Sequence, residues 1–217
     1  MRFVFEQIRV GGDRNFGYLL GDREAGEAIL IDPSFDPDGA VGRAQAQGLK
    51  VTRILNTHGH PDHSNGNARA KQLSGAPVAA GPHYPGPVDH VLKDGERLPF
   101  GRFRLKVWEV PGHCPDHLAF LVEEMDAGIT GDLLFVGKVG GTATEADGRT
   151  EWASLQRLLR EWPPHATLWP GHDYGARPSS TVDLERRTNP FLLAPSVEAF
   201  LNLKAEWPEF KARHGLK

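Results

Sequence analysis

The sequence predicts an α/β fold in which two mixed β-sheets pack against each other with helices on the outside. Two observations lead to this prediction. Segments with the short apolar or alternating pattern of strands outnumber segments with helical spacing, and several strands follow one another across short turns. The helical segments lie between strands, so we expect them to cover the outer faces of the sheets.

The limits of the elements follow from periodicity and from turn residues. Strands are predicted at residues 3–10, 16–20, 28–32, 51–55, 77–80, 103–107, 118–122, 128–132 and 167–169. Helices are predicted from residue 37 or 38 to about 47, from 64 to about 73, at 152–159, from 196 toward 204, and at 207–214 after a break at Pro208. Residues 81–89 and 137–148 are glycine-rich and are predicted as loops. Trp108 and Val110 break the alternation of the strand before them, which predicts a bulge.

Length and composition limit the class of protein. The 217 residues suffice for one sizeable core or at most two small domains, and no linker composition divides them. We therefore expect one domain over residues 1–217, with a short helical tail from about residue 191. The formal charge of −3, without a basic stretch, argues against a nucleic-acid partner, and no apolar run reaches the length of a membrane span.

The cellular compartment is predicted from the cysteine count and the first residues. Cys114 is the only cysteine, so no disulfide can form within the chain, and Glu6 comes too early for the core of a secretion signal. We expect a cytoplasmic protein that acts on a small molecule. Trp207, Phe210 and the other apolar residues of the tail close either the protomer's own core or the interface of a homo-oligomer.

Residues 54–63 gather four potential metal ligands directly after an apolar strand. The four are His58, His60, Asp62 and His63. Imidazole and carboxylate groups suit zinc, iron and related divalent metals. Their spacing is too short for ligands presented at i and i+4 of a helix, so we predict a turn that wraps its side chains around one point. A lone histidine is usually a surface or hydrogen-bonded core residue, but four such groups together are costly to bury without a partner.

Three other predicted strands also end at a potential ligand. They lead to His113, Asp132 and His172. Each has an ordinary explanation when taken singly, as a turn residue, a turn cap or a surface side chain. Loops at strand ends, however, are where a rigid scaffold usually presents functional groups. Seven ligands are then available, too many for one tetrahedral zinc and suited to two metals that share a bridge.

These motifs resemble the metallo-β-lactamase superfamily. The resemblance is carried by residues 57–63, 111–113, 130–132 and 170–174, and it extends roughly over residues 15–192. Within the superfamily the chain looks most like hydrolases related to glyoxalase II, the hydroxyacylglutathione hydrolase. The resemblance implies a four-layer αβ/βα sandwich with the active site at one edge.

The resemblance also implies an assignment of the ligands. In the family pattern, metal 1 is held by His58, His60 and His113, metal 2 by Asp62, His63 and His172, and Asp132 bridges both. We expect two divalent ions, with zinc first and iron or manganese as alternatives, because the same ligands accept all three. Asp62 and Asp132 are the candidates for catalytic residues.

The activity that the resemblance implies is hydrolysis of an acyl thioester, such as an acylated glutathione. A hydroxide whose pKa is lowered by two cations would attack the carbonyl carbon, and the thiolate leaves readily. Typical glyoxalase II enzymes have a longer C-terminal helical domain that grips glutathione, and this chain departs from them there. Lys138 and His117 are the candidates for substrate contact, with a solvated loop lysine as the alternative for Lys138.

Other activities remain open at this point. Residues 18–23 and 180–190 also resemble persulfide dioxygenases, which bind one iron at positions that match His58, His113 and Asp132. A small lactonase is a further alternative, as is a metal-binding protein without turnover.

Residues beside the ligands have candidate supporting roles. Asp32 and Asp173 are carboxylates that can accept the second N–H of a ligating histidine, and a turn cap is the alternative for both. Cys114 is either a further ligand or a small buried side chain. Asp116 and His117 are expected to shape the pocket or hold a water.

Overall fold

A computed structural model describes residues 2–214 of the chain. Its strands are β1 (Phe3–Gly11), β2 (Asn15–Asp22), β3 (Glu27–Ile31), β4 (Lys50–Leu55), β5 (Val78–Ala80), β6 (His90–Val91), β7 (Arg97–Phe100), β8 (Phe103–Glu109), β9 (Leu118–Val122), β10 (Ala127–Gly131), β11 (Leu134–Phe135), β12 (Lys138–Val139), β13 (Thr167–Pro170) and β14 (Ser180–Thr181). Its helices are α1 (Pro37–Ala46), α2 (Pro61–Ser64), α3 (Asn67–Ser74), α4 (Glu145–Glu161), α5 (Val182–Thr188) and α6 (Val197–His214).

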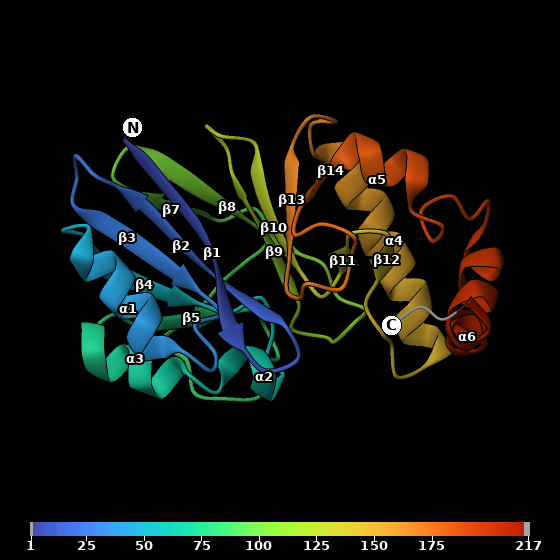
Figure 1. The fold of residues 1–217 in the computed structure, drawn as a ribbon, viewed down its shortest axis with the longest axis horizontal. Helices are drawn as coiled ribbons and strands as arrows, with labels where there is room; N and C mark the ends of the chain where they lie inside the picture. Colours follow the sequence, from blue (N-terminus) through green and yellow to red (C-terminus); the bar gives the residue numbers. More distant parts are fainter. Residues whose placement is uncertain (1, 215–217) are drawn as a thin grey trace.

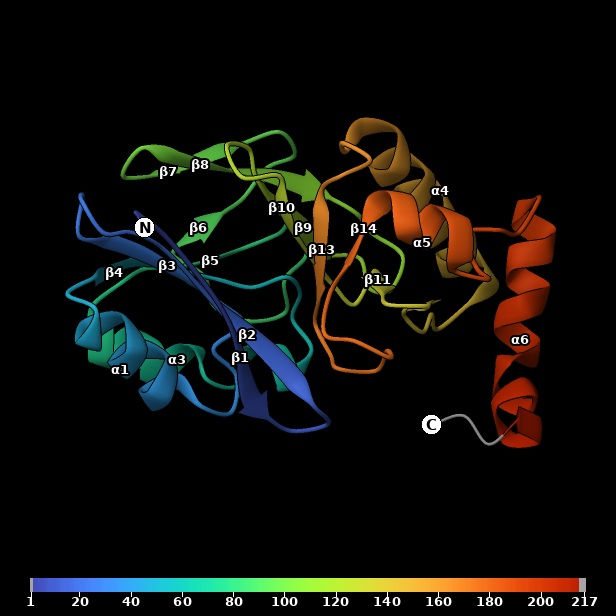
Figure 2. The ribbon, with the colours of Figure 1, turned by 45° about the horizontal axis from the view of Figure 1, so that its top comes forward.

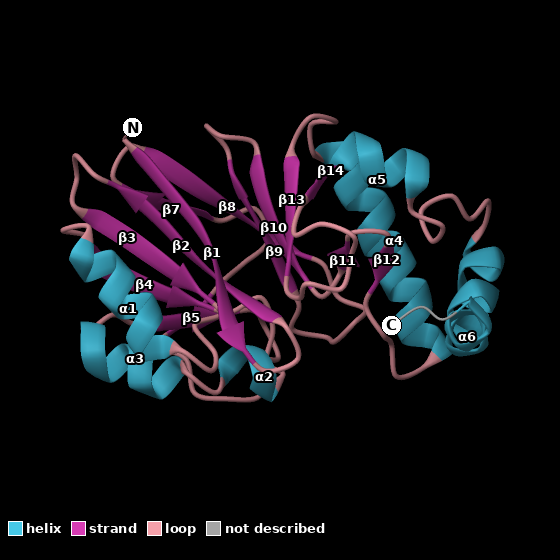
Figure 3. Cartoon of the chain, in the orientation of Figure 1, coloured by secondary structure: helices cyan, strands magenta, loops and turns pink. Residues whose placement is uncertain are grey.

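The strands form two six-stranded mixed sheets, which confirms the predicted fold class. The first sheet has the order β1-β2-β3-β4-β5-β6 and the second the order β14-β13-β10-β9-β8-β7. Figure 1 shows α1 and α3 outside the first sheet and α4, α5 and α6 outside the second, and Figure 2 shows the same arrangement from a turned view. Helices therefore flank both sheets in an αβ/βα sandwich (Figure 3). Within residues 2–214, no helix has both the length and the apolar character needed to span a membrane.

Side-chain alternation along the strands explains the layers. On β2, Tyr18 and Leu20 belong to the apolar core between the sheets, whereas Leu19 packs in the core beneath α1 and α3. A third core lies between the second sheet and α4–α6, with Leu155 of α4 and Phe200 of α6. Burial of both faces keeps the sheets rigid, so their strand ends provide fixed positions for the loops that follow.

Two predictions about regular structure are wrong. The bulge predicted at Trp108 is not formed, since β8 pairs with β9 in continuous register from Leu105 to Glu109. The pattern breaks because both faces of this strand are buried: Val107 packs between the sheets and Trp108 packs against Trp162. The helix break predicted at Pro208 is also not formed, because α6 continues through that residue.

Other differences concern the limits of elements. The loop predicted at 137–148 contains β12 and the first turn of α4, which begins after a capping box formed by Thr144 and Asp147. The ligand turn includes the single helical turn α2, which carries Asp62 and His63. Strands β6, β7, β11 and β14 and helix α5 were not predicted.

Asp22, at the end of β2, holds the sheet against the β7–β8 turn, and its ionisation is expected to stabilise the fold. Its buried carboxylate accepts hydrogen bonds from the Arg2 guanidinium (Nε–Oδ1 2.8 Å) and the Arg102 N–H (2.9 Å), and the bond from Arg2 lowers the pKa of Asp22 to about 2. Because the pKa of Asp22 is lower in the folded protein, its ionisation stabilises the fold in full at pH values above the ordinary pKa of 3.8. This stabilisation is lost as the pH falls through about 2. We expect Asp22→Asn to reduce the free energy of unfolding by about 2 kcal/mol at pH 7, and by less near pH 3.

Urea unfolding of the two proteins at both pH values measures this effect. Glu24→Gln is a matched control, because Glu24 also pairs with Arg2 but its side chain is 68% exposed. An equal loss of stability in Asp22→Asn at both pH values would contradict the role of its ionisation.

Candidate metal centre

The structure brings all seven predicted ligands together at one end of the sandwich. They come from the loop after β4 (His58 and His60), from α2 (Asp62 and His63), and from the loops after β8 (His113), β10 (Asp132) and β13 (His172). The two sheets contribute to the same edge, so residues more than a hundred positions apart in sequence become neighbours. His63 and His172, for example, have their Nε2 atoms 3.2 Å apart.

The first group of donors is formed by three imidazoles. His60 Nδ1 lies 3.0 Å from His58 Nε2 and 3.0 Å from His113 Nε2. The His58 and His60 rings meet edge to face, as do those of His60 and His113. Three ring nitrogens therefore converge on one point.

The second group is formed by Asp62, His63 and His172. Asp62 Oδ2 lies 3.6 Å from His63 Nε2 and 3.4 Å from His172 Nε2. Asp132 lies between the two groups: its Oδ1 is 3.4 Å from His63 Nε2, and its Oδ2 is 3.4 Å from His172 Nε2 and 3.7 Å from His113 Nε2. Among residues 2–214, Asp132 is thus the carboxylate within reach of both groups.

In four of the five ligating histidines, the ring nitrogen that faces away from the site is held by a second residue, which sets the tautomer. His63 Nδ1–H donates to Asp32 Oδ2 (3.0 Å), His113 Nδ1–H to the carbonyl of Gly141 (2.7 Å), and His172 Nδ1–H to the carbonyl of Asp13 (2.9 Å). His58 Nδ1 lies 3.0 Å from the hydroxyl of Thr57, which itself donates to Asp32. In these four rings the Nε2 lone pair is then the one available to a cation, whereas His60 presents Nδ1.

This arrangement fits bound cations. Imidazole lone pairs and carboxylate oxygens are acceptors, so acceptors 3.0–3.4 Å apart repel unless a proton or a cation lies between them. Asp132 Oδ1 is buried and has no hydrogen-bond partner among the described residues. The donor set matches the nitrogen and oxygen ligands of zinc, iron and manganese.

The pKa shifts follow from the same crowding. Burial and the neighbouring His63 lower the pKa of His58, so His58 is neutral and able to ligate. Burial also lowers the pKa of His172, but the carboxylates of Asp132 and Asp62 outweigh it and raise this pKa to about 10. The same histidine keeps the pKa of Asp62 well below its usual range. The pKa of Asp132 is lowered as well, so Asp62 and Asp132 are both available as anionic ligands.

A further set of contacts around His172 was not predicted from the sequence. The ring of Tyr174 stacks on His172 with centroids 4.6 Å apart, and its hydroxyl donates to Asp13 Oδ2. Lys138 Nζ lies 4.2 Å from the centroid of the Tyr174 ring, and Arg14 lies 4.7 Å from it. Asp13 thus holds His172 with its backbone and Tyr174 with its side chain.

Of the two candidate supporting carboxylates, one contacts a ligand. Asp32 holds His63, and its backbone adopts a positive φ of 48°, an uncommon conformation that is often found at functional sites. Asp173 pairs with Arg9 instead, so the supporting role predicted for it is not observed.

Cys114 and His117, which follow His113 in the sequence, lie against the ligand His58. His117 is buried, stacks on His58 and accepts the backbone N–H of Asp132 at its Nε2, a position that supports ligands and does not suit substrate contact. Cys114 has its sulfur near the donor atoms of His58 and His60, but burial and the neighbouring Asp116 raise the pKa of its thiol. A neutral thiol is a poor metal ligand.

Replacing Asp32 is expected to weaken the second group of ligands. Asp32→Asn keeps the shape but offers a different hydrogen-bonding group to His63 Nδ1 and Thr57, so the His63 ring loses its fixed tautomer. Such changes next to a ligand typically cost 10–100-fold in metal affinity. We expect a loss of that size in a zinc competition titration against a chelator. Asp173→Asn, close to His172 but paired elsewhere, should bind zinc like the wild type.

Comparison with known proteins places the chain in a family. Residues 10–86 match the model of the metallo-β-lactamase superfamily. Human mitochondrial persulfide dioxygenase ETHE1 is 32% identical over 94% of this chain and 79% of its own length. A hydroxyacylglutathione hydrolase of Rhodospirillum rubrum is 32% identical over 97% of this chain and 96% of its own length. The crystal structure of ETHE1 from Myxococcus xanthus superimposes with a TM-score of 0.86 at 27% identity, covering 94% of this chain and 91% of that one.

The chain belongs to the metallo-β-lactamase superfamily. Its relatives include both hydroxyacylglutathione hydrolases and persulfide dioxygenases, so membership points to an enzyme with a metal-binding site and leaves two reactions to be separated.

Proposed function

We propose that this protein is a binuclear metallohydrolase that cleaves acyl thioesters, with an acylated glutathione as the expected substrate. The observation that carries the proposal is the position of Asp132 between two complete groups of donors. His58, His60 and His113 would hold one cation, and Asp62, His63 and His172 the other. Divalent cations in such a pair lower the pKa of a water and polarise a carbonyl oxygen.

The protein's own residues would orient the reaction. Asp132, within reach of both groups, would fix the separation of the two cations. Asp32 holds the ring of His63, and the carbonyl of Gly141 holds the ring of His113, so the ligands are already directed before any ion binds. Such preorganisation reduces the cost of assembling the site.

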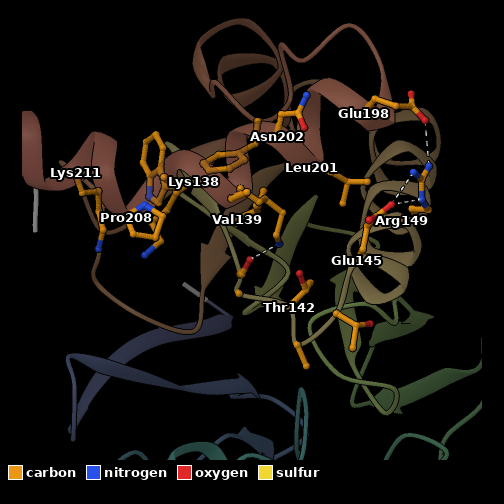
Figure 4. Close-up of a pocket in the computed structure, with 18 residues that line it drawn as sticks. Lys138, Val139, Thr142, Glu145, Arg149, Glu198, Leu201, Asn202, Pro208 and Lys211 are labelled. Atoms are coloured by element: carbon orange, nitrogen blue, oxygen red, sulfur yellow. Dashed lines mark hydrogen bonds and ion pairs between the residues drawn. The ribbon is translucent and has the colours of Figure 1, made fainter.

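A cavity lined in part by Gly140 and Gly141, which adjoin His113, would hold the remainder of the substrate, although none of the seven ligands lines it. It has a volume of about 680 Å³ and lies between the loop at 138–145, α4 and α6 (Figure 4). Its walls combine the cations Lys138, Lys204 and Lys211 with the apolar side chains of Leu201 and Trp207. Its two acids, Glu145 and Glu198, are paired with Arg149. This lining suits an anionic thiol carrier such as glutathione. Lys138 is partly buried against Tyr174, which favours substrate contact over the solvated loop lysine.

A second candidate function is persulfide dioxygenation. It is favoured by the similarity to human ETHE1 over most of both chains, and by the presence of His58, His113 and Asp132, which form a two-histidine, one-carboxylate set. That set is characteristic of mononuclear non-haem iron oxygenases.

Metal analysis combined with two assays tests the proposal. The protein is purified without added metal, its metals are counted per chain, and the same preparation is assayed for thiol release from an acyl-glutathione and for oxygen uptake with glutathione persulfide. We expect two metals per chain and thiol release. If the protein contains one iron per chain, takes up oxygen and releases no thiol, it is a dioxygenase and the hydrolase proposal is wrong.

Lys138→Met extends this test to the cavity. If Lys138 contacts the substrate's anionic arm, the variant should raise KM for acyl-glutathione several-fold while the metal content stays at the wild-type value. An unchanged KM would remove Lys138 from the substrate site.

A further inference from the structure

Helices α4 and α6 share an ion pair that is almost fully withdrawn from solvent. Glu151 of α4 is fully buried, and Lys204 of α6, whose side chain is 13% exposed, donates to its Oε2. Glu151 Oε1 has no hydrogen-bond partner among the described residues. Burying such a pair costs desolvation energy that its attraction rarely exceeds, so stability alone does not explain it.

Lys204 also reaches the loop that orients a ligand. Its Nζ donates to the carbonyl of Gly140 at 2.7 Å, and the carbonyl of the next residue, Gly141, accepts the Nδ1–H of His113 at 2.7 Å. Gly140 itself lies against the centre: a Cβ at this position would be 2.9 Å from His113 Nδ1 and 2.0 Å from the Asp132 carbonyl oxygen. A shift of this short loop would therefore move the group that holds His113.

Glu151 is placed against the chain segment on the other side of the same ligand. Gly112 has a φ of 141° and packs so closely on α4 that a Cβ would lie 2.3 Å from the Cα of Glu151. One turn further along α4, the hydroxyl of Ser154 donates to the carbonyl of Pro111 at 2.7 Å. The backbone that leads into His113 is thus fixed by α4, and the loop that holds its ring is fixed from α6.

We propose that Lys204, held by Glu151, is a positioning residue that sets the orientation of His113 and so couples the C-terminal helix to the first group of metal ligands. This inference rests on the proposed function in that it takes His113 as a ligand. Lys204 also lines the cavity proposed for the substrate, so its positioning role is tested by zinc affinity and not by KM. It acts through the carbonyls of Gly140 and Gly141.

A neutral double variant tests the proposal without leaving a buried charge. Lys204→Met with Glu151→Leu removes the ion pair and the bond to Gly140, while apolar side chains of similar length fill the space. We expect one of the two zinc sites to weaken by about 10-fold or more in a stepwise chelator competition, the size typical for loss of a group that supports a ligand. The other site should change less than about twofold.

Arg149→Met is the matched control. Arg149 also joins α4 to α6, through Glu198 at 3.1 Å, but its partners are acids on the two helices, Glu145 and Glu198. It should leave both zinc sites unchanged. Equal weakening in this control would overturn the proposal, because general loosening of α6 would then explain the result.

A double-mutant cycle with His113→Ala separates positioning from structure. If Lys204 acts through His113, the neutral double variant should cause no further loss of zinc affinity once His113 is absent. A further loss of the same size in that background would overturn the proposal. A wild-type protein that binds no zinc would instead refute the proposed function, whereas two intact zinc sites in the neutral double variant would refute this inference alone.

Discussion

Asp132→Ala is expected to abolish thioester hydrolysis. Asp132 is the carboxylate within 3.7 Å of ligands from both groups, so its loss removes the shared ligand and its negative charge from a buried site. The two cations would then repel each other without a bridge between them. We expect kcat/KM for acyl-glutathione to fall by more than about 1000-fold, equivalent to about 4 kcal/mol of transition-state stabilisation. The metal content should fall from two toward one per chain.

Asp173→Ala controls for a nonspecific effect of removing an acid near the centre. Asp173 follows the ligand His172 in sequence but forms an ion pair with Arg9, so its variant should keep both metals and full turnover. Full turnover in Asp132→Ala would show that the reaction does not depend on the shared carboxylate, and the binuclear proposal would then fail.

The ligands were predictable because each is marked by its own side chain at the end of an apolar strand. The sequence contains four donors within six residues, from His58 to His63. The other three, His113, Asp132 and His172, each follow a strand that the periodicity of the sequence predicts. A buried strand fixes where its end lies, so local pattern and topology together place the donors at one edge. The assignment of each donor to one of two metals, with Asp132 shared, could not be derived from spacing and depended on the family resemblance.

The groups that hold the ligands were less predictable, because most of them act through the backbone. The carbonyls of Asp13 and Gly141 orient His172 and His113, and any residue type provides a carbonyl. Asp32, in contrast, was predicted because a carboxylate side chain is visible in the sequence. Asp173 has the same chemistry but faces Arg9, which only the fold determines.

The misassigned elements have a similar cause. Trp108 breaks the alternating pattern because α4 covers the second face of its sheet. The residues of one strand cannot indicate a helix that begins only at Glu145. Pro208 predicts a break because proline lacks an N–H, yet packing of Trp207 against Phe191 on the same core keeps α6 continuous. Tertiary contacts outweigh local preference at both places.

Removing the metals is expected to destabilise the protein as well as inactivate it. Without cations, His60 Nδ1 faces the Nε2 atoms of His58 and His113 at 3.0 Å. The negative charges of Asp62 and Asp132 are then balanced by protonated His172. Ligand binding to the folded state contributes about 2.7 kcal/mol per site when free metal is at 100 times its Kd. For a chain of this length, two filled sites should raise the melting temperature by at least about 10 °C.

Dialysis against a chelator, followed by a thermal melt and an activity assay, measures both effects. We expect turnover to disappear with the metals and to return on addition of two equivalents of zinc per chain, together with the higher melting temperature. Asp62→Ala provides the matched comparison, since it removes one ligand of the second group while His58, His60 and His113 remain. The Asp62→Ala variant should bind about one equivalent of zinc per chain, and zinc should raise its melting temperature by about half as much as that of the wild type. Identical melts before and after chelation would show that these seven side chains do not hold metal in the folded protein, because any cation bound only to the native state must shift its unfolding equilibrium.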